Sequence, residues 1–242
     1  MPHGTCPSLR SDHSCSRERT VSERLSTAWA EHDMPLGPAA IFVSGRRQLK
    51  AKVCLVGEIA VGKTSLVRRY TVGSFDDRYT TTLGINLSKK VVDLPPSHDG
   101  PPAHLELIVF DIMGQRKLRD LLTESYFKGV QGLLAVCDVT RRETLEELPN
   151  WIEMAEEVAG RVPLVIAVNK MDLAGDLRFG ESDVSQVARA YGGEWLTTSA
   201  RTSANVEEAF RRLGMALVAH HRIRPNAGEA LAIAHPDRQG SP

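Results

Sequence analysis

Short apolar runs alternate with helix-like segments along the middle of the chain. Four of these runs are rich in Val, Ile and Leu and too short for good helices, at 52–57, 105–112, 132–139 and 163–170. Runs of this kind are typical of strands that are buried on both faces of a sheet. A weaker run at 194–200 predicts a fifth strand, and the more polar stretch 85–94 predicts a strand at the edge of the sheet.

Segments with helical spacing lie between these runs. In the segment 145–158 apolar residues recur every three or four positions, and Pro149 is expected to divide it into a short turn and a longer helix. Thr140 and Glu143, just before it, have the spacing of a capping box. Two further apolar stripes follow, at 184–191 and 206–217. Strands alternating with helices predict an α/β fold: a mostly parallel six-stranded sheet with one antiparallel edge strand and helices on both faces.

The two ends of the chain differ from this pattern. Residues 1–48 are rich in Ser, Arg, His and Pro and show no sustained apolar period, which predicts a disordered extension. Met34 inside this extension is a second candidate for the start of the protein. Residues 222–242 are predicted to be a flexible tail, so the folded domain is expected at 49–221.

Cys6 and Cys15 flank His13 in the N-terminal extension. Their spacing matches no zinc pattern, so loose polar residues are the expected interpretation and a zinc site is the open alternative.

Composition and charge exclude several classes of partner. Lys+Arg and Asp+Glu both number 30, so nothing in the net charge attracts nucleic acid or an anionic membrane over long range. No apolar run reaches the ~18 residues of a membrane span. No cysteine lies near the C-terminus, so no lipid anchor is expected there. The protein is therefore expected in the cytoplasm.

The strongest motif is "GEIAVGKT" at 57–64, which fits the phosphate-binding pattern G-x-x-x-x-G-K-[ST]. It follows a predicted strand and precedes a predicted helix, so its backbone N–H groups can form an anion-binding nest at a helix N-terminus. Lys63 would reach the β and γ phosphates, and the Thr64 hydroxyl would bind Mg²⁺. The alternative is a chance glycine-rich turn. The expected phosphate-binding residues are Gly57, Glu58, Ile59, Ala60, Val61, Gly62, Lys63, Thr64 and Ser65.

A second motif, Asn169-Lys170-Met171-Asp172, ends the run 163–170. A carboxylate such as Asp172 can accept the N1–H and the N2 amine of guanine, whereas adenine would leave it unpaired. Sites of this type reject the wrong base by roughly 10⁴-fold or more. A helix cap is the alternative interpretation. Backbone N–H groups of Ser199, Ala200 and Arg201, after the fifth strand, could reach the guanine O6.

Two further segments complete a candidate site for GTP or GDP with Mg²⁺. In "DIMGQ", Asp111 can hold Mg²⁺ through a water molecule, and Gly114 allows a backbone N–H to approach a γ-phosphate. Gln115 can orient an attacking water. The Thr82 hydroxyl, in "RYTTTLGIN", could complete the Mg²⁺ shell.

With these five motifs in order, residues 49–221 resemble the Ras-like small GTPases, and within them the Rab-like group. The phrases "GKTSLVRRY", "YTTTLGI" and "VCDVT" look most like prokaryotic, archaeal-type members. The resemblance implies a P-loop NTPase G domain, GTP and GDP binding, slow hydrolysis with Gln115, and stacking of Phe75 on the guanine. It also implies a switch at 75–84 and 112–127, through which effector, exchange-factor and activating proteins would bind.

The chain departs from this family at several positions. Ile59 is bulky where the family admits an arginine from an activating partner, so its side chain either crowds that path or points outward. Met113 adds apolar bulk, Arg116 follows the glutamine, and Arg201 replaces a lysine. The connection 95–102 is longer than usual, and the absence of a lipid anchor keeps Rab-like membrane traffic from carrying over.

Three functions follow from these observations. A GTPase switch is favoured by Gln115 and Thr82. A scaffold that holds GTP with little turnover is favoured by Ile59 and Met113. An ATP-using P-loop kinase would need an acceptor site and would not need the motif at 169–172.

Overall fold

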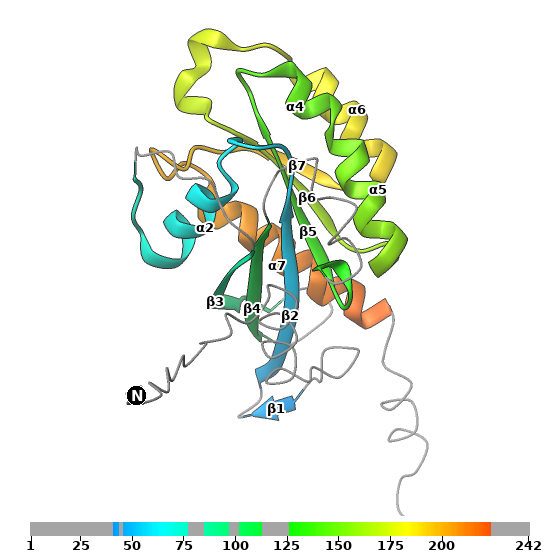
Figure 1. Cartoon of the computed structure of the whole chain (residues 1–242). Coiled ribbons are helices and arrows are strands. Elements are labelled where there is room, and N and C mark those ends of the chain that lie inside the picture. The colour runs from blue at the N-terminus through cyan, green and yellow to red at the C-terminus, as the bar shows by residue number, and fades with distance from the viewer. Residues whose placement is uncertain (1–40, 44–45, 77–84, 97–101, 113–125, 224–242) are drawn as a thin grey trace, which may run out of the picture. The chain divides into compact units, whose positions relative to one another are not determined.

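A mixed β-sheet forms the core of the domain (Figure 1). The computed structural model describes residues 41–43, 46–76, 85–96, 102–112 and 126–223. The main strands are β2 (Arg46–Val56), β3 (Ile85–Leu94), β4 (Ala103–Ile112), β5 (Gly132–Asp138), β6 (Leu164–Asn169) and β7 (Glu194–Thr197). They lie in the order β3-β4-β2-β5-β6-β7, and only β3 runs antiparallel to its neighbour within this series. The predicted six-stranded sheet with one antiparallel edge strand is confirmed.

A short additional strand, β1 (Ile41–Val43), pairs antiparallel with the start of β2. Arg47 of β2 pairs with Phe42 on one side and with Ala103 of β4 on the other. Pairing with β1 extends β2 back to Arg46 and pairing with β4 extends it back to Arg47, although the apolar run begins only at residue 52. Strand residues 41–43 and 46–48 fall within the range 1–48, for which the sequence pattern predicts disorder.

The central strands are buried because helices cover both faces of the sheet. Every residue of β5 and β6 is buried, as expected of continuous apolar runs in a parallel sheet. Helices α2 (Lys63–Val72) and α7 (Val206–Ile223) pack together on one face, where Tyr70 stacks on Phe210 with ring centroids 3.8 Å apart. Helices α5 (Leu148–Ala159) and α6 (Glu181–Tyr191) lie on the other face (Figure 1).

The segment after β5 confirms one expectation and corrects another. Helix α4 (Arg142–Glu146) ends before Pro149, which lies in the first turn of α5, so proline does divide the segment. The predicted capping box is wrong, because Arg141 is the N-cap residue and no side chain caps α4. The Thr140 hydroxyl instead donates to Asp138, at 2.7 Å.

Parallel strands bring the loops that follow β2, β4, β5, β6 and β7 to one edge of the sheet. Ligands in α/β sheets bind at this edge. In the described part of the chain, no helix combines the length and the apolar character needed to cross a bilayer.

We predict that Phe210→Ala destabilises the fold strongly, because Phe210 is fully buried against Tyr70. The expected loss is about 3–5 kcal/mol in the free energy of unfolding, measured by urea denaturation followed by circular dichroism. Met215→Ala, at an exposed position of the same helix, is the control and should change stability by about 0.5 kcal/mol or less. A loss below about 1 kcal/mol for Phe210→Ala would contradict the packing described here.

Candidate functional site

The loop 57–62 joins β2 to α2 and requires glycine at its two ends. Gly57 has φ 133°, and a Cβ there would lie 2.2 Å from the Val136 carbonyl oxygen. Gly62 has φ 100°, and a Cβ there would lie 2.3 Å from Nδ2 of Asn169. Ala60 also adopts a left-handed conformation, with φ 63°. Left-handed residues within such a loop turn successive backbone N–H groups toward one concave side, which suits an anion.

Lys63, at the start of α2, closes this loop with its own side chain. Its ammonium is buried and donates to the carbonyls of Gly57, at 2.7 Å, and Glu58, at 2.8 Å. Burial lowers the pKa of Lys63 to about 8, while Asp111 and Glu58 oppose this change. An anion in the loop would therefore stabilise the protonated form. Ser65 follows in the first turn of α2 and is half-buried.

Thr64 and Asp111 present oxygen ligands beside Lys63. The Thr64 hydroxyl donates to Oδ2 of Asp111 at 2.5 Å. Burial raises the pKa of Asp111, and its Oδ1 has no hydrogen-bond partner among the residues that the structure describes. A buried carboxylate oxygen without a partner is costly unless a donor or a cation satisfies it. Hydroxyl and carboxylate oxygens suit a hard cation, so this pair fits Mg²⁺ bound directly or through water.

Asn169, at the end of β6, joins three of the loops. Its Nδ2 donates to the Val61 carbonyl at 2.8 Å, which fastens the loop 57–62. Its Oδ1 accepts from the Ala200 N–H at 3.2 Å and from the Thr198 hydroxyl at 3.3 Å, which fastens the loop after β7. The side chain is buried, so these bonds are not exchanged with solvent. Asn169 therefore sets the spacing between the loop 57–62 and the loop after β7.

Asp172 lies at the rim of the site, in the 3-10 segment Met171–Asp176, and is exposed. The Ser199 hydroxyl donates to its Oδ1 at 2.6 Å and so orients the carboxylate. In this structure the N–H groups of Ser199 and Ala200 donate to Ala204 and Asn169 within the protein, and their expected contact with the guanine O6 stays a prediction. These bonds hold the loop after β7 in place.

Arg69, which the sequence analysis did not single out, braces the same loop from α2. It donates to the carbonyls of Ala200 and Arg201, both at 2.8 Å. Its guanidinium also lies 5.8 Å from the ring centroid of the half-buried Phe75. An arginine on a helix carries no local sequence signal for such a role, because only the fold brings α2 beside this loop.

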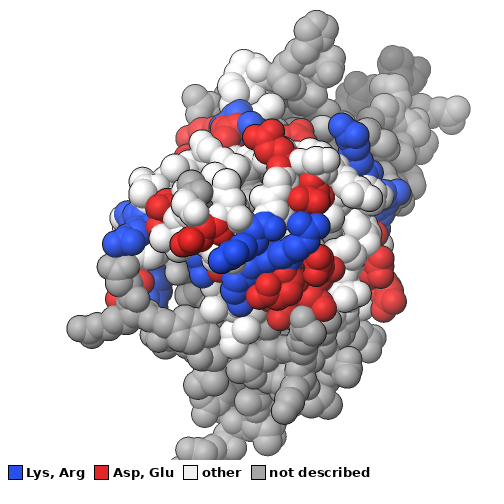
Figure 2. Space-filling view, turned by 90° about the horizontal axis from the view of Figure 1, so that it is seen from above, with Lys and Arg blue, Asp and Glu red and all other residues white. Residues whose placement is uncertain are grey.

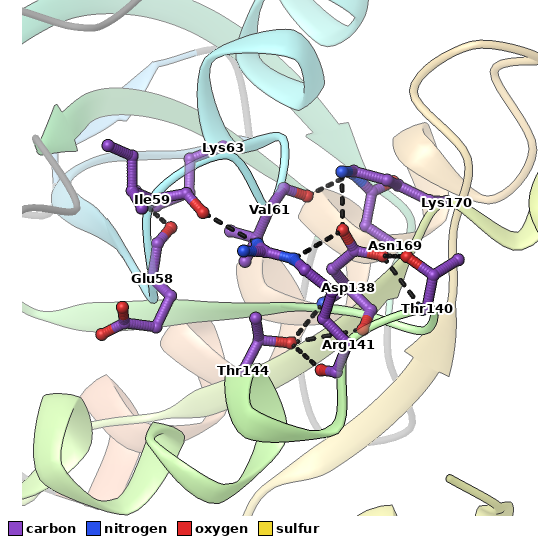
Figure 3. Close-up of polar contacts among 10 residues, drawn as sticks. All are labelled: Glu58, Ile59, Val61, Lys63, Asp138, Thr140, Arg141, Thr144, Asn169 and Lys170. Carbon is purple, nitrogen blue, oxygen red and sulfur yellow. Dashed lines mark hydrogen bonds and ion pairs between the residues drawn. The ribbon is translucent and has the colours of Figure 1, made fainter. Parts of the chain in front are cut away.

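Asp138 is the second residue that the sequence analysis missed. This buried carboxylate ends β5 and accepts from Lys170 at 2.6 Å, from Nε of Arg141 at 3.2 Å and from the Thr140 hydroxyl at 2.7 Å (Figure 3). Burial opposes its ionisation, but the hydrogen bonds from Lys170 and Thr140 outweigh burial and lower the pKa of Asp138. The available signal was one acidic residue next to the end of the otherwise apolar run 132–139.

The outer part of the phosphate loop contacts two other elements. Trp151 of α5 donates from Nε1 to the buried Glu58 at 3.2 Å. Arg141 donates from Nη2 to the Ile59 carbonyl at 2.8 Å. The Ile59 side chain is 36% exposed and lies away from Arg141 (Figure 3). Whether it crowds a partner's arginine stays a prediction, because Met113 and Gln115 lie outside the described residues.

Other expectations also fall outside the described residues. They concern Thr82, Gly114, Gln115 and Arg116, most of the ranges 75–84 and 112–127, and Cys6, His13 and Cys15. Around the described site, basic and acidic side chains are interleaved (Figure 2). Among the residues that the structure describes, anion binding at this end therefore depends on local groups such as Lys63 and not on a broad basic surface.

Comparison with known proteins assigns the family. The sequence model of the Ras family matches residues 52–219. The human Ras-related protein Rab-8B is 34% identical over 160 residues, which cover 66% of this chain and 74% of that protein. The dog Rab-13 is 31% identical, covering 67% and 77%, and the human Rab-32 is 31% identical, covering 80% and 86%. These relatives are animal Rab proteins, so the expected closeness to archaeal-type members is not supported.

The match covers most of the chain, and its residues include the phosphate loop, the Asn169 motif and Asp111 described above. The chain therefore belongs to the Ras family, and it is a small guanine-nucleotide-binding switch protein with GTPase activity.

Proposed function

We propose that this GTPase holds GTP or GDP with the phosphates in the loop 57–65 and the guanine between Asp172 and the loop 199–201. The observation that carries the proposal is the buried Asn169, which bonds to both loops at once. A ligand that fits both must have an anionic end and a flat polar end at a set separation. A guanine nucleotide has this form, and Phe75 is proposed to stack on its base.

Guanine selectivity is assigned to Asp172. Ser199 orients the carboxylate at the exposed rim, where it can accept two donors from a base. Adenine lacks these donors, so binding adenine would desolvate the carboxylate without replacing its hydrogen bonds. The backbone N–H groups of Ser199, Ala200 and Arg201 are proposed to reach the O6 atom. Lys170 is proposed to face the nucleotide while Asp138 holds its ammonium.

Lys63 is proposed to donate to the β and γ phosphates in exchange for the carbonyls that it contacts here. Thr64 and Asp111 would hold Mg²⁺, with Thr82 as a further ligand. The bound ion would neutralise phosphate charge.

For hydrolysis, Gln115 is proposed to orient a water molecule that attacks the γ-phosphorus. The bond between the γ-phosphorus and the β–γ bridging oxygen breaks, GDP leaves with that oxygen, and the water oxygen becomes part of inorganic phosphate while one of its protons passes to a phosphate oxygen. The Gly114 N–H would contact the γ-phosphate. An amide orients water but takes up no proton, so the intrinsic turnover is proposed to be slow.

Replacement of GDP by GTP would change the conformation of the segments 75–84 and 112–127. Effectors, exchange factors and activating proteins are proposed to bind through these segments. A GTP-holding scaffold with little turnover is the second candidate. It is favoured by the apolar Ile59 side chain, 36% exposed on the outer part of the phosphate loop. The expected cytoplasmic location stays a prediction.

Guanine specificity can be tested with Asp172→Asn. An amide donates where the carboxylate accepted, so GTP affinity should fall by about 100-fold or more while xanthosine triphosphate affinity rises. Titration of nucleotide-free protein measures both affinities, together with that of ATP. Asp176→Asn, in the same segment, is the control and should leave the preference unchanged. Equal affinity of the wild type for ATP and GTP would contradict guanine recognition by Asp172.

The metal assignment predicts that EDTA accelerates the release of bound fluorescent GDP. Thr64→Ala should weaken GTP more than GDP, because the γ-phosphate shares the ion. Thr71→Ala removes another hydroxyl from the same helix, one that donates to the Val67 carbonyl, and should preserve the ratio of the two affinities. An unchanged GDP off-rate in EDTA would count against the proposed ligands.

Turnover can be tested by single-turnover hydrolysis of GTP. Gln115→Leu should slow it on the order of 10- to 100-fold while leaving GTP affinity intact, because an apolar side chain cannot orient water.

The path of a partner's arginine can be tested with a surrogate activating protein that supplies an arginine. This protein should accelerate GTP hydrolysis by Ile59→Gly but not by the wild type. Equal responses would show that Ile59 points away from the arginine's path, and unmeasurable wild-type turnover would favour the scaffold.

A further inference from the structure

Arg141 links the phosphate loop to a buried carboxylate on the neighbouring strand. It follows β5 and precedes α4, and two nitrogens of its guanidinium are engaged. Nε donates to Oδ2 of Asp138 at 3.2 Å, and Nη2 donates to the Ile59 carbonyl at 2.8 Å (Figure 3). The planar guanidinium suits such paired recognition, because its donors have fixed relative directions.

The surroundings hold Arg141 in place. Asp138 is buried and is itself fixed by Lys170 and Thr140. The hydroxyl of the buried Thr144 donates to the Arg141 carbonyl at 2.7 Å and accepts from the Asp138 N–H at 2.9 Å. Arg141 is therefore anchored through both its side chain and its backbone, unlike a solvated arginine on a surface loop.

The bond to Ile59 constrains one peptide unit of the phosphate loop. In a trans peptide the C=O and the following N–H point in opposite directions, and no described peptide bond is cis. Holding the Ile59 carbonyl toward Arg141 therefore points the Ala60 N–H away from Arg141. Ala60 also has φ 63°, a conformation that is unfavourable for a residue with a Cβ. An external contact can offset the cost of holding an alanine in this conformation.

We propose that Arg141 is a positioning residue for nucleotide binding, which holds the Ile59–Ala60 peptide so that the Ala60 N–H donates to a nucleotide phosphate. The inference rests on the proposed function, since it assumes phosphates in the loop 57–65. Arg141 thus acts as a clamp, defined here as the contact that offsets the cost of an alanine at the left-handed position 60. The inference also gives Asp138 a role, because this carboxylate fixes Arg141 and Lys170 and so connects phosphate binding to base binding.

Two cations contact the same short loop, since Lys63 donates to the carbonyls of Gly57 and Glu58 and Arg141 donates to that of Ile59. An anion bound at the backbone N–H groups of this loop would offset part of their positive charge.

The test compares the release of fluorescent GDP and of a non-hydrolysable GTP analogue, with Mg²⁺ present, from wild type, Arg141→Ala and Arg142→Ala. Arg142 is the adjacent residue of the same sequence segment, but it pairs with Glu146 and Asp183 at the surface. Arg141→Ala should accelerate the release of both ligands on the order of 10-fold, the effect of losing a charge-assisted hydrogen bond. Arg142→Ala should release them at the wild-type rate.

Two further variants separate positioning from general stabilisation. Arg141→Lys keeps the charge but cannot reproduce the paired geometry, so its release rates should fall between those of wild type and Arg141→Ala. Ala60→Gly removes the backbone strain that the clamp offsets. In the A60G background, Arg141→Ala should accelerate release clearly less than it does alone. A merely structural role would leave the effect of Arg141→Ala the same in both backgrounds.

The outcomes are distinct. If wild type binds no guanine nucleotide, both the proposed function and this inference are contradicted. If wild type binds GDP but Arg141→Ala releases it as Arg142→Ala does, only the clamp is wrong. If Arg141→Ala leaves both release rates unchanged but slows single-turnover hydrolysis, Arg141 acts in the chemical step, and the positioning role is overturned. A single cooperative thermal unfolding transition in each of the two alanine variants would show that both are folded.

Discussion

The side-chain amide of Asn169 is the interaction on which the arrangement of this site depends. Parallel strands bring their loops to one edge of the sheet, but they do not set the distances between those loops. Asn169 sets them by donating to Val61 and accepting from Ala200. It also leaves no room for a Cβ at Gly62, which would lie 2.3 Å from its Nδ2. One buried amide thus dictates both the spacing of two loops and a residue type in one of them.

The buried charges of the site divide into those compensated by the protein and those left for a ligand. Asp138 has Lys170 and Arg141 as partners, and its pKa is lowered despite burial. Burial raises the pKa of Asp111 and lowers that of Lys63 to about 8, so for both groups the charged form is disfavoured. Buried ions of this kind are stabilised when opposite charges complete them. A polyphosphate with a divalent cation carries both charges that are needed, as expected of a GTPase.

The local sequence pattern predicted secondary structure correctly where burial determines it. The pattern failed where contacts with residues distant in the sequence determine the structure. The runs 132–139 and 163–170 differ from the fully buried strands β5 and β6 by one residue at their ends. The start of β2 was missed because polar residues there are held in the sheet by pairing with β1 and β4. The expected cap at Thr140 failed because the hydroxyl bonds to Asp138, a partner that lies outside the helix.

The sequence by itself determined the order of the main strands and helices and the residues of the phosphate loop and the base motif. It could do so because these features depend on near neighbours: apolar spacing, glycine where the chain must turn, and a lysine and threonine at a helix start. Only the tertiary structure decided the parts played by Arg69, Asp138 and Arg141. Ile59 and Arg141 are far apart in the chain, and their contact exists because β5 pairs with β2. An arginine that bonds to a distant carbonyl looks in sequence like any surface arginine, since its partner is supplied by the fold.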